Sequence, residues 1–315
     1  GVTNAMLAGS IANSKLANSS ITVGAGVNST AISLGGTINF AGTSNEVEVA
    51  ESSGTITIGL PAATEITTSL GVGGGSTNGV VHLTAMAGRL GINVDLKEFD
   101  RLTQDLPMIV DLKPSGLGYM EDLYKAGGSI RIFNELKAFL HLDAKLVNGK
   151  TLGDEILKAS KWNQDIITSK DNPVFKGGSI AVLSGSLAPG CAIIKQSAAT
   201  SELLVHEGKA VVFENLEDLA NRVDSDNLEV TKNDVLVLKS IGPKGGPGMP
   251  EAGLIPIPKK LARQGVKDMV RISDGRMSGT ASGTIVLHVT PESHEKGPLA
   301  IVKNGDLIKL DVPNR

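Results

Sequence analysis

The chain has 315 residues, with 30 Lys and Arg against 33 Asp and Glu, and its formal net charge is −3. This length leaves room for more than one domain, and the weak negative charge gives no electrostatic basis for binding nucleic acid. Apolar runs are interrupted well before the roughly 18 residues of a membrane span, and no signal-like segment opens the sequence. One cysteine, Cys191, excludes an internal disulfide, so we expect a cytoplasmic protein without a membrane partner.

Residues 1–68 differ in composition from the rest, being rich in Ser, Thr, Asn, Gly and Ala. Apolar residues recur every five positions over 6–21, a period that fits neither a helix nor an isolated strand. Alternation over 47–58 predicts two short strands about Gly54. This β-rich repetitive segment resembles parts of phage tail-fibre and other virion structural proteins, and a poorly ordered leader is the alternative.

Residues 69–170 are predicted to form part of an α/β layer. A glycine-rich turn at 71–79 precedes apolar residues at helical spacing from Val80 to Leu90. Such a turn before a helix can bind an anion through backbone N–H groups, although the Walker and dinucleotide patterns are missing. The further predicted elements are helices at 95–103, 119–126, 130–142 and 152–158 and a buried strand at 106–112. Strands are too few here for a complete sheet.

Residues 171–315 are predicted to be a strand-rich domain. The predicted strands are 180–183, 192–195, 210–213, 235–238, 269–272, 284–288, 300–302 and 306–310, with helices at 217–222 and 258–264. Many short strands with few helices indicate a barrel or sandwich with helical inserts. The fold class expected is therefore an α/β remnant at 69–170 followed by a β-barrel-like domain at 171–315.

Two loops, 242–251 and 273–280, carry the residues best suited to chemistry. The first has four Gly and three Pro in ten residues, a composition that excludes a helix or an inner strand, and it ends at the carboxylate of Glu251. The second places the hydroxyl of Ser278 close to an acid and a base. Because one amphipathic helix separates the two loops, we expect them to form the two sides of one site.

Five motifs, in order, resemble those of the IlvD/Edd dehydratases, which include dihydroxy-acid, phosphogluconate and sugar-acid dehydratases. They are Gly74-Gly75-Ser76-Thr77-Asn78, Asp111-Leu112-Lys113-Pro114-Ser115-Gly116, Gly190-Cys191-Ala192-Ile193-Ile194-Lys195, Gly245-Gly246-Pro247-Gly248-Met249-Pro250-Glu251 and Ser273-Asp274-Gly275-Arg276-Met277-Ser278-Gly279. The resemblance covers residues from about 70 to 315, and the stretches 255–260 and 277–280 look more like the sugar-acid branch.

The resemblance implies removal of water from a 2,3-dihydroxy acid to give a 2-keto acid, with Mg²⁺ and a [2Fe–2S] cluster as cofactors. By matching motifs, it implies that Glu251 is a Mg²⁺ ligand and that Ser278 is the base for the C2 proton. The residues it implies for substrate binding are Ser76, Thr77, Asn78, Asp274, Arg276 and Thr280. Helix capping is the alternative for the first three, and a local turn-stabilising pair is the alternative for Asp274 and Arg276.

The sequence departs from the family upstream of the Gly-Gly-Ser-Thr-Asn turn, where the cluster cysteines and the other Mg²⁺ ligands belong. Residues 1–68 contain neither Cys nor His, and a cluster needs about four ligands. We interpret Cys191 as a buried core residue and the scattered histidines as structural. We therefore expect the chain, taken alone, to be an incomplete and inactive dehydratase.

The expected partner is a small polyhydroxy acid, and the resemblance also allows a family-like homodimer. Two alternatives from other classes remain open at this point. One is a virion structural or adhesion protein that carries a captured enzyme domain. The other is a module that binds small acids through Glu251 and Ser278 without chemistry.

Overall fold

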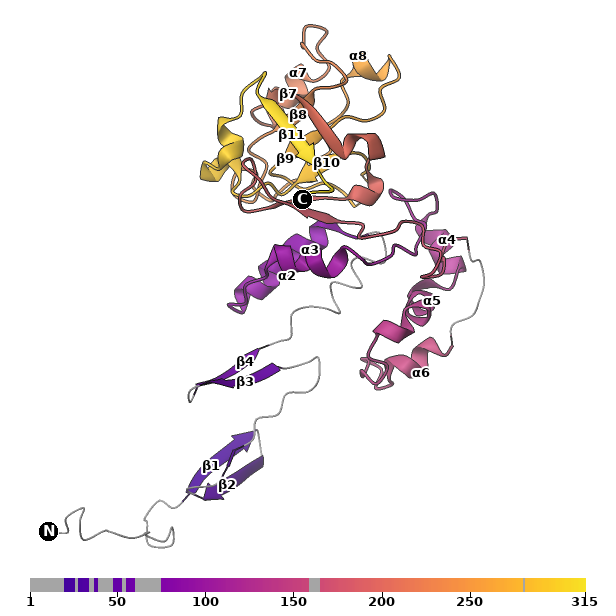
Figure 1. Cartoon of the computed structure of the whole chain (residues 1–315), viewed down its shortest axis with the longest axis vertical. Coiled ribbons are helices and arrows are strands. Elements are labelled where there is room, and N and C mark those ends of the chain that lie inside the picture. Colours follow the sequence, from indigo (N-terminus) through magenta and orange to yellow (C-terminus); the bar gives the residue numbers. More distant parts are fainter. Residues whose placement is uncertain are drawn as a thin grey trace, which may run out of the picture. The chain divides into compact units, whose positions relative to one another are not determined.

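The computed structural model describes residues 20–25, 28–33, 37–38, 48–52, 55–59, 75–158, 165–279 and 281–315. The chain divides into two compact units, Gly1–Ala63 and Thr64–Arg315 (Figure 1). The proposed domain boundary at residue 170 remains a prediction.

The first unit contains two antiparallel hairpins. Strand β1 (Ser20–Ala25) pairs with β2 (Asn28–Ser33), and β3 (Glu48–Ser52) pairs with β4 (Thr55–Gly59). The second hairpin confirms the two strands predicted from the alternation over 47–58. The five-residue repeat lies mostly outside the described residues.

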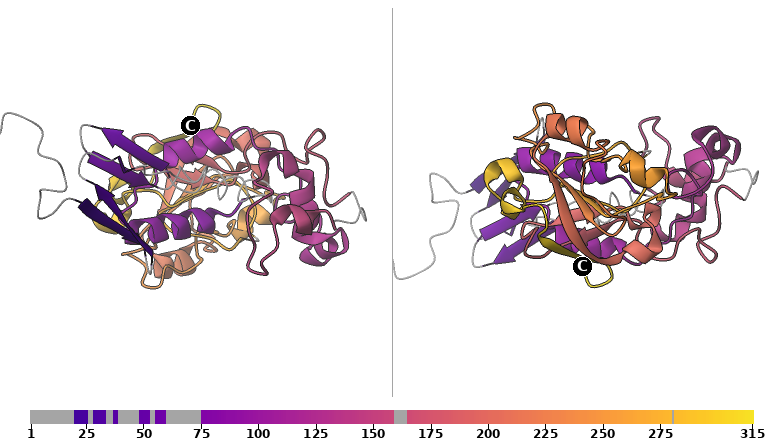
Figure 2. Two further views of the ribbon diagram at one scale, coloured as in Figure 1. Left: turned by 90° about the horizontal axis from the view of Figure 1, so that it is seen from below. Right: turned by 90° about the horizontal axis from the view of Figure 1, so that it is seen from above.

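A curled, mixed sheet of seven strands organises the second unit (Figure 2). Its strands are β5 (Ala181–Leu183), β6 (Ala192–Ile194), β7 (Val205–Phe213), β8 (Val235–Leu238), β9 (Arg271–Ser273), β10 (Ile285–Leu287) and β11 (Leu307–Asp311). The order across the sheet is β11-β7-β8-β9-β10-β6-β5. Strands β7 to β10 are parallel, whereas β11, β6 and β5 run antiparallel to their neighbours.

The predicted strand-rich domain is therefore confirmed as a sheet with helices, although the sheet is open. Its edges are β11 and β5, which do not pair with each other in the part of the chain that the structure describes. The predicted strand at 300–302 is wrong, because residues Pro298–Ile301 form the 3-10 helix η7. Proline at its first position fixes a helical φ and suits a helix start.

Two predictions between residues 75 and 158 are also wrong in extent. The strand predicted at 106–112 forms only isolated bridges, such as Met108 with Phe175, because no continuous strand runs beside it. The single helix predicted at 130–142 is instead α5 (Gly128–Glu135) followed by the 3-10 helix η3 (Lys137–Phe139).

Successive side chains along each strand point to opposite faces of the sheet, and apolar side chains are buried on both faces. One face carries a core built from all seven strands, which includes Ile194, Val237 and Ile272. The opposite face is covered near β7 and β8 by α7 (Leu216–Arg222) and α8 (Lys259–Ala262).

Helices α2 (Thr77–Arg89) and α3 (Leu96–Thr103) cover that same opposite face near β5 and β6. Val80 and Phe99 from these helices pack with Ile180, Val182 and Ile193. This contact places the N-terminal part of α2 against strands β5 and β6.

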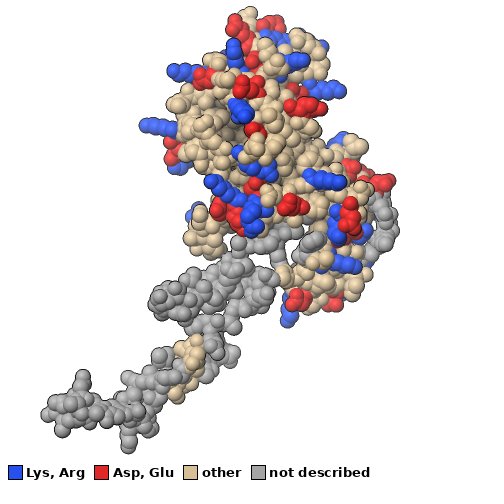
Figure 3. Space-filling model, in the orientation of Figure 1, with Lys and Arg blue, Asp and Glu red and all other residues tan. Residues whose placement is uncertain are grey.

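The remaining helices, α4 (Met120–Lys125), α5 and α6 (Leu152–Ile156), gather beside the sheet around a small separate core (Figures 1 and 2). None of the helices that the structure describes has the length and apolar character needed to cross a bilayer. Basic and acidic side chains are interspersed over the face shown in Figure 3, in keeping with the weak net charge.

Candidate functional site

The parallel strands β8, β9 and β10 end at the same edge of the sheet. The loop after β8 leads to Glu251, the loop after β9 carries Ser278, and His288 follows β10 directly. In α/β sheets, ligands bind at the carboxyl ends of the strands, because loops from separate strands meet there. The two loops do meet: Ala252 bridges with Met277, and the Gly253 N–H donates to the carbonyl oxygen of Arg276 at 2.7 Å.

Asn78, in the first turn of α2, links these two loops to the helix. Its Nδ2 donates to Glu251 Oε1 at 3.1 Å and to the carbonyl oxygen of Met277 at 3.0 Å. Arg276 Nη1 lies 3.9 Å from the same Glu251 oxygen. Three segments that are distant in sequence therefore converge on one carboxylate.

The turn before α2 is shaped by Gly75 and capped by Ser76. Gly75 has φ of +65°, and a Cβ there would lie 2.7 Å from the side chain of Ile180. Only glycine therefore lets the turn approach the sheet this closely. The Ser76 hydroxyl accepts the N–H of Gly79 at 3.1 Å and so caps α2, and Thr77 is buried. The substrate-binding role of both residues remains a prediction.

Ser278 is half-buried in its loop, where its carbonyl oxygen accepts the N–H of Ala281 at 3.0 Å. Thr280 lies outside the described residues. Arg276 holds the two loops together, since its Nε donates to the carbonyl oxygen of Met249 at 2.6 Å. Met249 has φ of +47°, so the tip of the Gly-Pro loop is held in the left-handed region.

Asp274 is buried below these loops and is engaged within the protein. Its Oδ1 accepts the N–H of Ile241, and its Oδ2 accepts both the N–H and the hydroxyl of Ser293. These contacts tie together the segments that follow β8, β9 and β10. They differ from the Asp274–Arg276 pair considered from the sequence, and the substrate-binding role of Asp274 remains a prediction.

Within the described residues, the fully enclosed polar atoms without a hydrogen-bond partner are Asn78 Oδ1 and both ring nitrogens of His288. Burial, and then the charge of Arg276, lowers the pKa of His288 to about 4. Its φ of +55° is unusual for a residue with a side chain. Unpaired buried groups and strained backbone gather at functional sites, so His288 joins the candidate site.

Sequence reasoning grouped His288 with the structural histidines. His288 comes directly after an apolar segment that the sequence predicts as a strand. That position indicates a site residue only if the strand is parallel to β9, and the sequence does not show this. Lys244, in the loop 242–251, is exposed and pairs with Glu295 at 2.9 Å.

We expect the stability of the Thr64–Arg315 unit to fall as pH drops from 6.5 to 4. In this window the unfolded chain protonates His288 while the folded state keeps it neutral, so unfolding takes up a proton. The loss attributable to this residue should not exceed about 3 kcal/mol. Urea unfolding at several pH values measures it, and His288→Gln should flatten the profile. An unchanged profile in that variant would contradict the assignment, with the exposed His82 replaced in the same way as the control.

The oxygen atoms near Glu251 fit a hard cation, but the chain's one thiol does not fit a cluster. Mg²⁺ is commonly held by one or two carboxylates with further oxygen ligands, and Glu251 and the unpaired Asn78 Oδ1 are of that kind. No three His, Cys, Asp or Glu side chains among the described residues lie close enough together to hold a metal by themselves. Cys191 is buried among apolar residues, and this burial raises the pKa of its thiol.

A hollow of about 990 Å³ lies elsewhere, lined by β7, the 225–234 segment and the 304–307 turn. Neither Glu251 nor Ser278 borders it. The loops at the carboxyl ends of the strands, and not this hollow, carry the convergent polar groups.

Comparison with known proteins finds two family models that together cover most of the chain. Residues 62–155 match the family model described as dihydroxy-acid/6-phosphogluconate dehydratase N-terminal, and residues 165–315 match the corresponding C-terminal model. The chain is 50% identical to L-arabinonate dehydratase of Rhizobium leguminosarum bv. trifolii over 244 residues, which are 77% of this chain and 42% of that protein.

Two further relatives act on different acids by name. The chain is 45% identical to 6-deoxy-6-sulfo-D-gluconate dehydratase of Pseudomonas putida over 76% of this chain and 42% of that protein. It is 41% identical to dihydroxy-acid dehydratase of Caldanaerobacter subterraneus subsp. tengcongensis over 77% of this chain and 43% of that protein. The chain thus spans less than half the length of these relatives. Both domain matches and all three relatives agree on one conclusion: the chain belongs to the IlvD/Edd dehydratase family.

Proposed function

We propose that this chain carries the part of a hydro-lyase that binds a 2,3-dihydroxy acid or sugar acid and removes its C2 proton. The observation that carries the proposal is the convergence of Asn78, Arg276 and Glu251 beside the Ser278 loop. The names of the relatives support the substrate class, and the 50% identity to an L-arabinonate dehydratase favours a sugar acid.

In the proposed reaction, the Ser278 oxygen takes the proton from C2 and the electron pair of that C–H bond forms the C2–C3 double bond. The C3–OH bond breaks, and the leaving hydroxide takes up the proton that the ionised Ser278 oxygen removed from C2, so that water leaves and the Ser278 oxygen returns to its starting form. The enol then tautomerises to the 2-keto-3-deoxy acid. Atoms and charge balance, because one proton and one hydroxide leave as water.

The residues around Glu251 then have the following roles in this proposal. Arg276 and Asn78 hold the Glu251 carboxylate at the mouth of the two loops, at 3.9 and 3.1 Å from Oε1. Mg²⁺ held by Glu251 would supply positive charge that favours an ionised oxygen and a developing enolate. His288, whose pKa is lowered to about 4 by burial and by the charge of Arg276, is neutral at pH 7 and adds no positive charge of its own to the site.

The test measures removal of the C2 proton alone. Loss of the C3 hydroxyl is expected in this family to need an iron–sulfur cluster, and this chain has one thiol to hold it. The full chain with Mg²⁺ and L-arabinonate in D₂O should exchange the C2 proton for deuterium, as seen by ¹H NMR. Ser278→Ala should slow the exchange by about 10²-fold or more, as expected for loss of a general base.

Ser282→Ala is the matched control, because Ser282 is an exposed serine in the same loop region. Exchange at an equal rate in Ser278→Ala and the parent chain would reject Ser278 as the base. No exchange above the buffer rate in the parent chain would reject the proposed function for this chain.

A further inference from the structure

Lys195 is a buried cation with no role in the proposed reaction. It follows β6 directly, and its exposed fraction is 7%. Within the described residues its ammonium group makes no hydrogen bond or ion pair. That nitrogen is nevertheless not one of the fully enclosed unpaired atoms, so it keeps access to solvent. An ammonium group held at this depth without an oxygen partner is costly, since burial disfavours the charged form.

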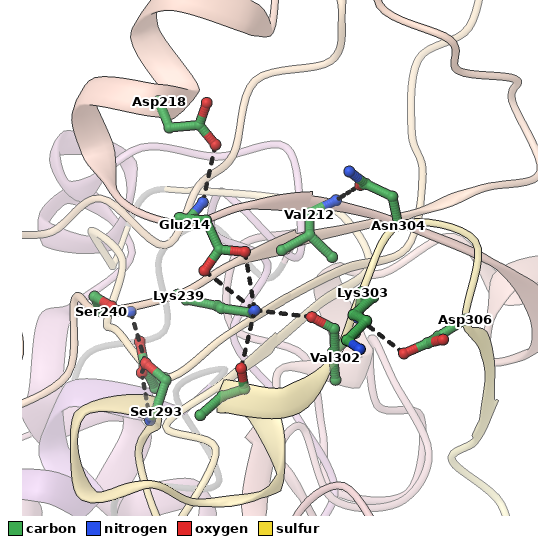
Figure 4. Close-up of polar contacts among 12 residues, drawn as sticks. Val212, Glu214, Asp218, Lys239, Ser240, Ser293, Val302, Lys303, Asn304 and Asp306 are labelled. Atoms are coloured by element: carbon green, nitrogen blue, oxygen red, sulfur yellow. Dashed lines mark hydrogen bonds and ion pairs between the residues drawn. The ribbon is translucent and has the colours of Figure 1, made fainter.

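The other buried lysine of this sheet shows what a structural lysine looks like in the same protein. Lys239, at 3% exposure, donates to both carboxylate oxygens of Glu214 and to the carbonyl oxygens of Ala300 and Val302, at 2.8–3.2 Å (Figure 4). Four oxygen atoms therefore surround that ammonium group. Among the described residues Lys195 has no equivalent set of oxygen partners.

The register of the sheet places Lys195 between a residue that supports the start of α2 and a residue that supports the Ser278 loop. Ala181 and Val286 both lie opposite Ile194, so one step along the sheet brings Ile180 and Ile285 opposite Lys195. The pairing continues past Lys195 on both sides, through Ser197 N–H to Ser179 O and Gly283 N–H to Ala198 O. Residues directly opposite one another share a face of the sheet.

The two neighbours of Lys195 support different walls of the site. Ile180 packs against Gly75 at the start of α2, and Ile285 packs with Met277 and Ala281 on either side of Ser278. Asn78 joins these walls directly, through its bond to the Met277 carbonyl oxygen. Lys195 therefore lies beneath the junction between the N-terminus of α2 and the Ser278 loop.

Both groups that meet at this junction attract an anion. The first-turn N–H groups of a helix have no intrahelical partners and carry the positive end of its dipole. Helix α2 is 13 residues long with no acidic residue in its first turn, and Ser76 satisfies only the N–H of Gly79. Arg271, in the same row as Lys195 one strand beyond Ile285, is neutralised by Asp268 at 2.6 Å and does not compete for an anion.

We propose that Lys195, together with the N-terminus of α2, binds the carboxylate of the hydroxy acid. This inference rests on the proposed function for the identity of the acid, but the oxyanion site itself stands on the geometry. The carboxylate satisfies the ammonium group and the free N–H groups at once. It also holds C2 beside the Ser278 loop. Burial lowers the pKa of Lys195 to about 8, so the group is cationic at neutral pH and able to bind an anion there.

The experiment measures binding by calorimetry at pH 7 to the full chain, with L-arabinonate, inorganic phosphate and L-arabitol, the polyol without a carboxylate. Lys195→Met keeps the length and apolar stem of the side chain, and Lys209→Met on β7 is the exposed matched control. We expect Lys195→Met to weaken L-arabinonate binding by about 20-fold or more, as for loss of a hydrogen bond to a charged group. Lys209→Met should leave binding unchanged, and L-arabitol should bind equally weakly to all three proteins.

A second readout separates this inference from the proposed function. The side-chain ¹³Cε signal of Lys195, assigned by its loss in Lys195→Met, should shift upon addition of either anion. Phosphate shifting the signal while L-arabinonate does not would support the oxyanion site and reject the proposed substrate. No shift with either anion, or equal L-arabinonate affinity in Lys195→Met, would overturn the inference.

Thermal unfolding tells a binding lysine from a structural one. Because Lys195→Met removes an unpaired buried charge, the variant should unfold at a Tm about 3 °C higher than the parent chain. A Tm well below that of the parent chain would make Lys195 a structural residue and overturn the inference even if binding were lost.

Discussion

Replacing Asp274 by alanine is expected to lower the unfolding free energy of the Thr64–Arg315 unit by about 3–5 kcal/mol. The carboxylate is 1% exposed and accepts N–H groups from Ile241 at 3.1 Å and Ser293 at 2.9 Å, and also the Ser293 hydroxyl. Alanine would leave these donors buried without acceptors and would release the segments after β8 and β10 from the loop that carries Ser278. Urea unfolding followed by circular dichroism measures the effect.

Asp306→Ala is the matched control for Asp274→Ala. Asp306 is exposed and accepts one N–H, that of Lys303, at 2.8 Å, so its loss should amount to about 1 kcal/mol or less. If Asp274→Ala lost less than this while anion binding disappeared, Asp274 would be a substrate-binding residue, as the family resemblance implies. A large loss of stability in Asp274→Ala alone would make its main task the support of the site.

Asp268→Ala should be comparably destabilising, by about 3–5 kcal/mol, because it strands a buried charge. Asp268 lies 2.6 Å from Arg271, whose exposed fraction is 4%. Burial raises the pKa of Asp268, but hydrogen bonds from Thr200 and Thr284 and the charge of Arg271 outweigh it and leave the pKa below its usual range. The pair is therefore ionised at neutral pH, and removing one partner leaves the other uncompensated.

The double variant Asp268→Ala, Arg271→Met isolates this cause. If the stranded guanidinium dominates, the double variant should unfold at a higher urea concentration than Asp268→Ala alone, since an apolar side chain replaces the unpaired charge. A double variant less stable than Asp268→Ala would show that Arg271 contributes mainly through its bond to the Ile255 carbonyl oxygen at 3.1 Å. The midpoint of urea unfolding distinguishes the two.

These two aspartates and Lys195 show how differently one sheet uses its buried charges. Asp274 and the Asp268–Arg271 pair are completed by groups of the protein itself. Lys195 and His288 are not, within the described residues. We therefore base the proposed ligand contacts on buried groups without partners and not on burial alone.

The local elements were largely predictable from the sequence. Strand β8 has the predicted bounds, 235–238, because four consecutive β-branched or Leu residues between turn residues suit a strand buried on both faces. The start of α3 at Leu96 follows from the Asp95 cap, which accepts the N–H of Lys97. In both cases the determining residues are neighbours along the chain.

The sequence by itself determined which family the chain resembles and which segments are candidates for the site, because motifs such as Gly-Gly-Ser-Thr-Asn and the Glu251 and Ser278 loops are contiguous. Tertiary structure alone decided that Asn78 bonds Glu251 across 173 positions and that Lys195 lies opposite Ile180 and Ile285 in the sheet. It also decided that Asp274 faces the protein interior. Sheet order and register bring these residues together, and neither is encoded in the residues next to them.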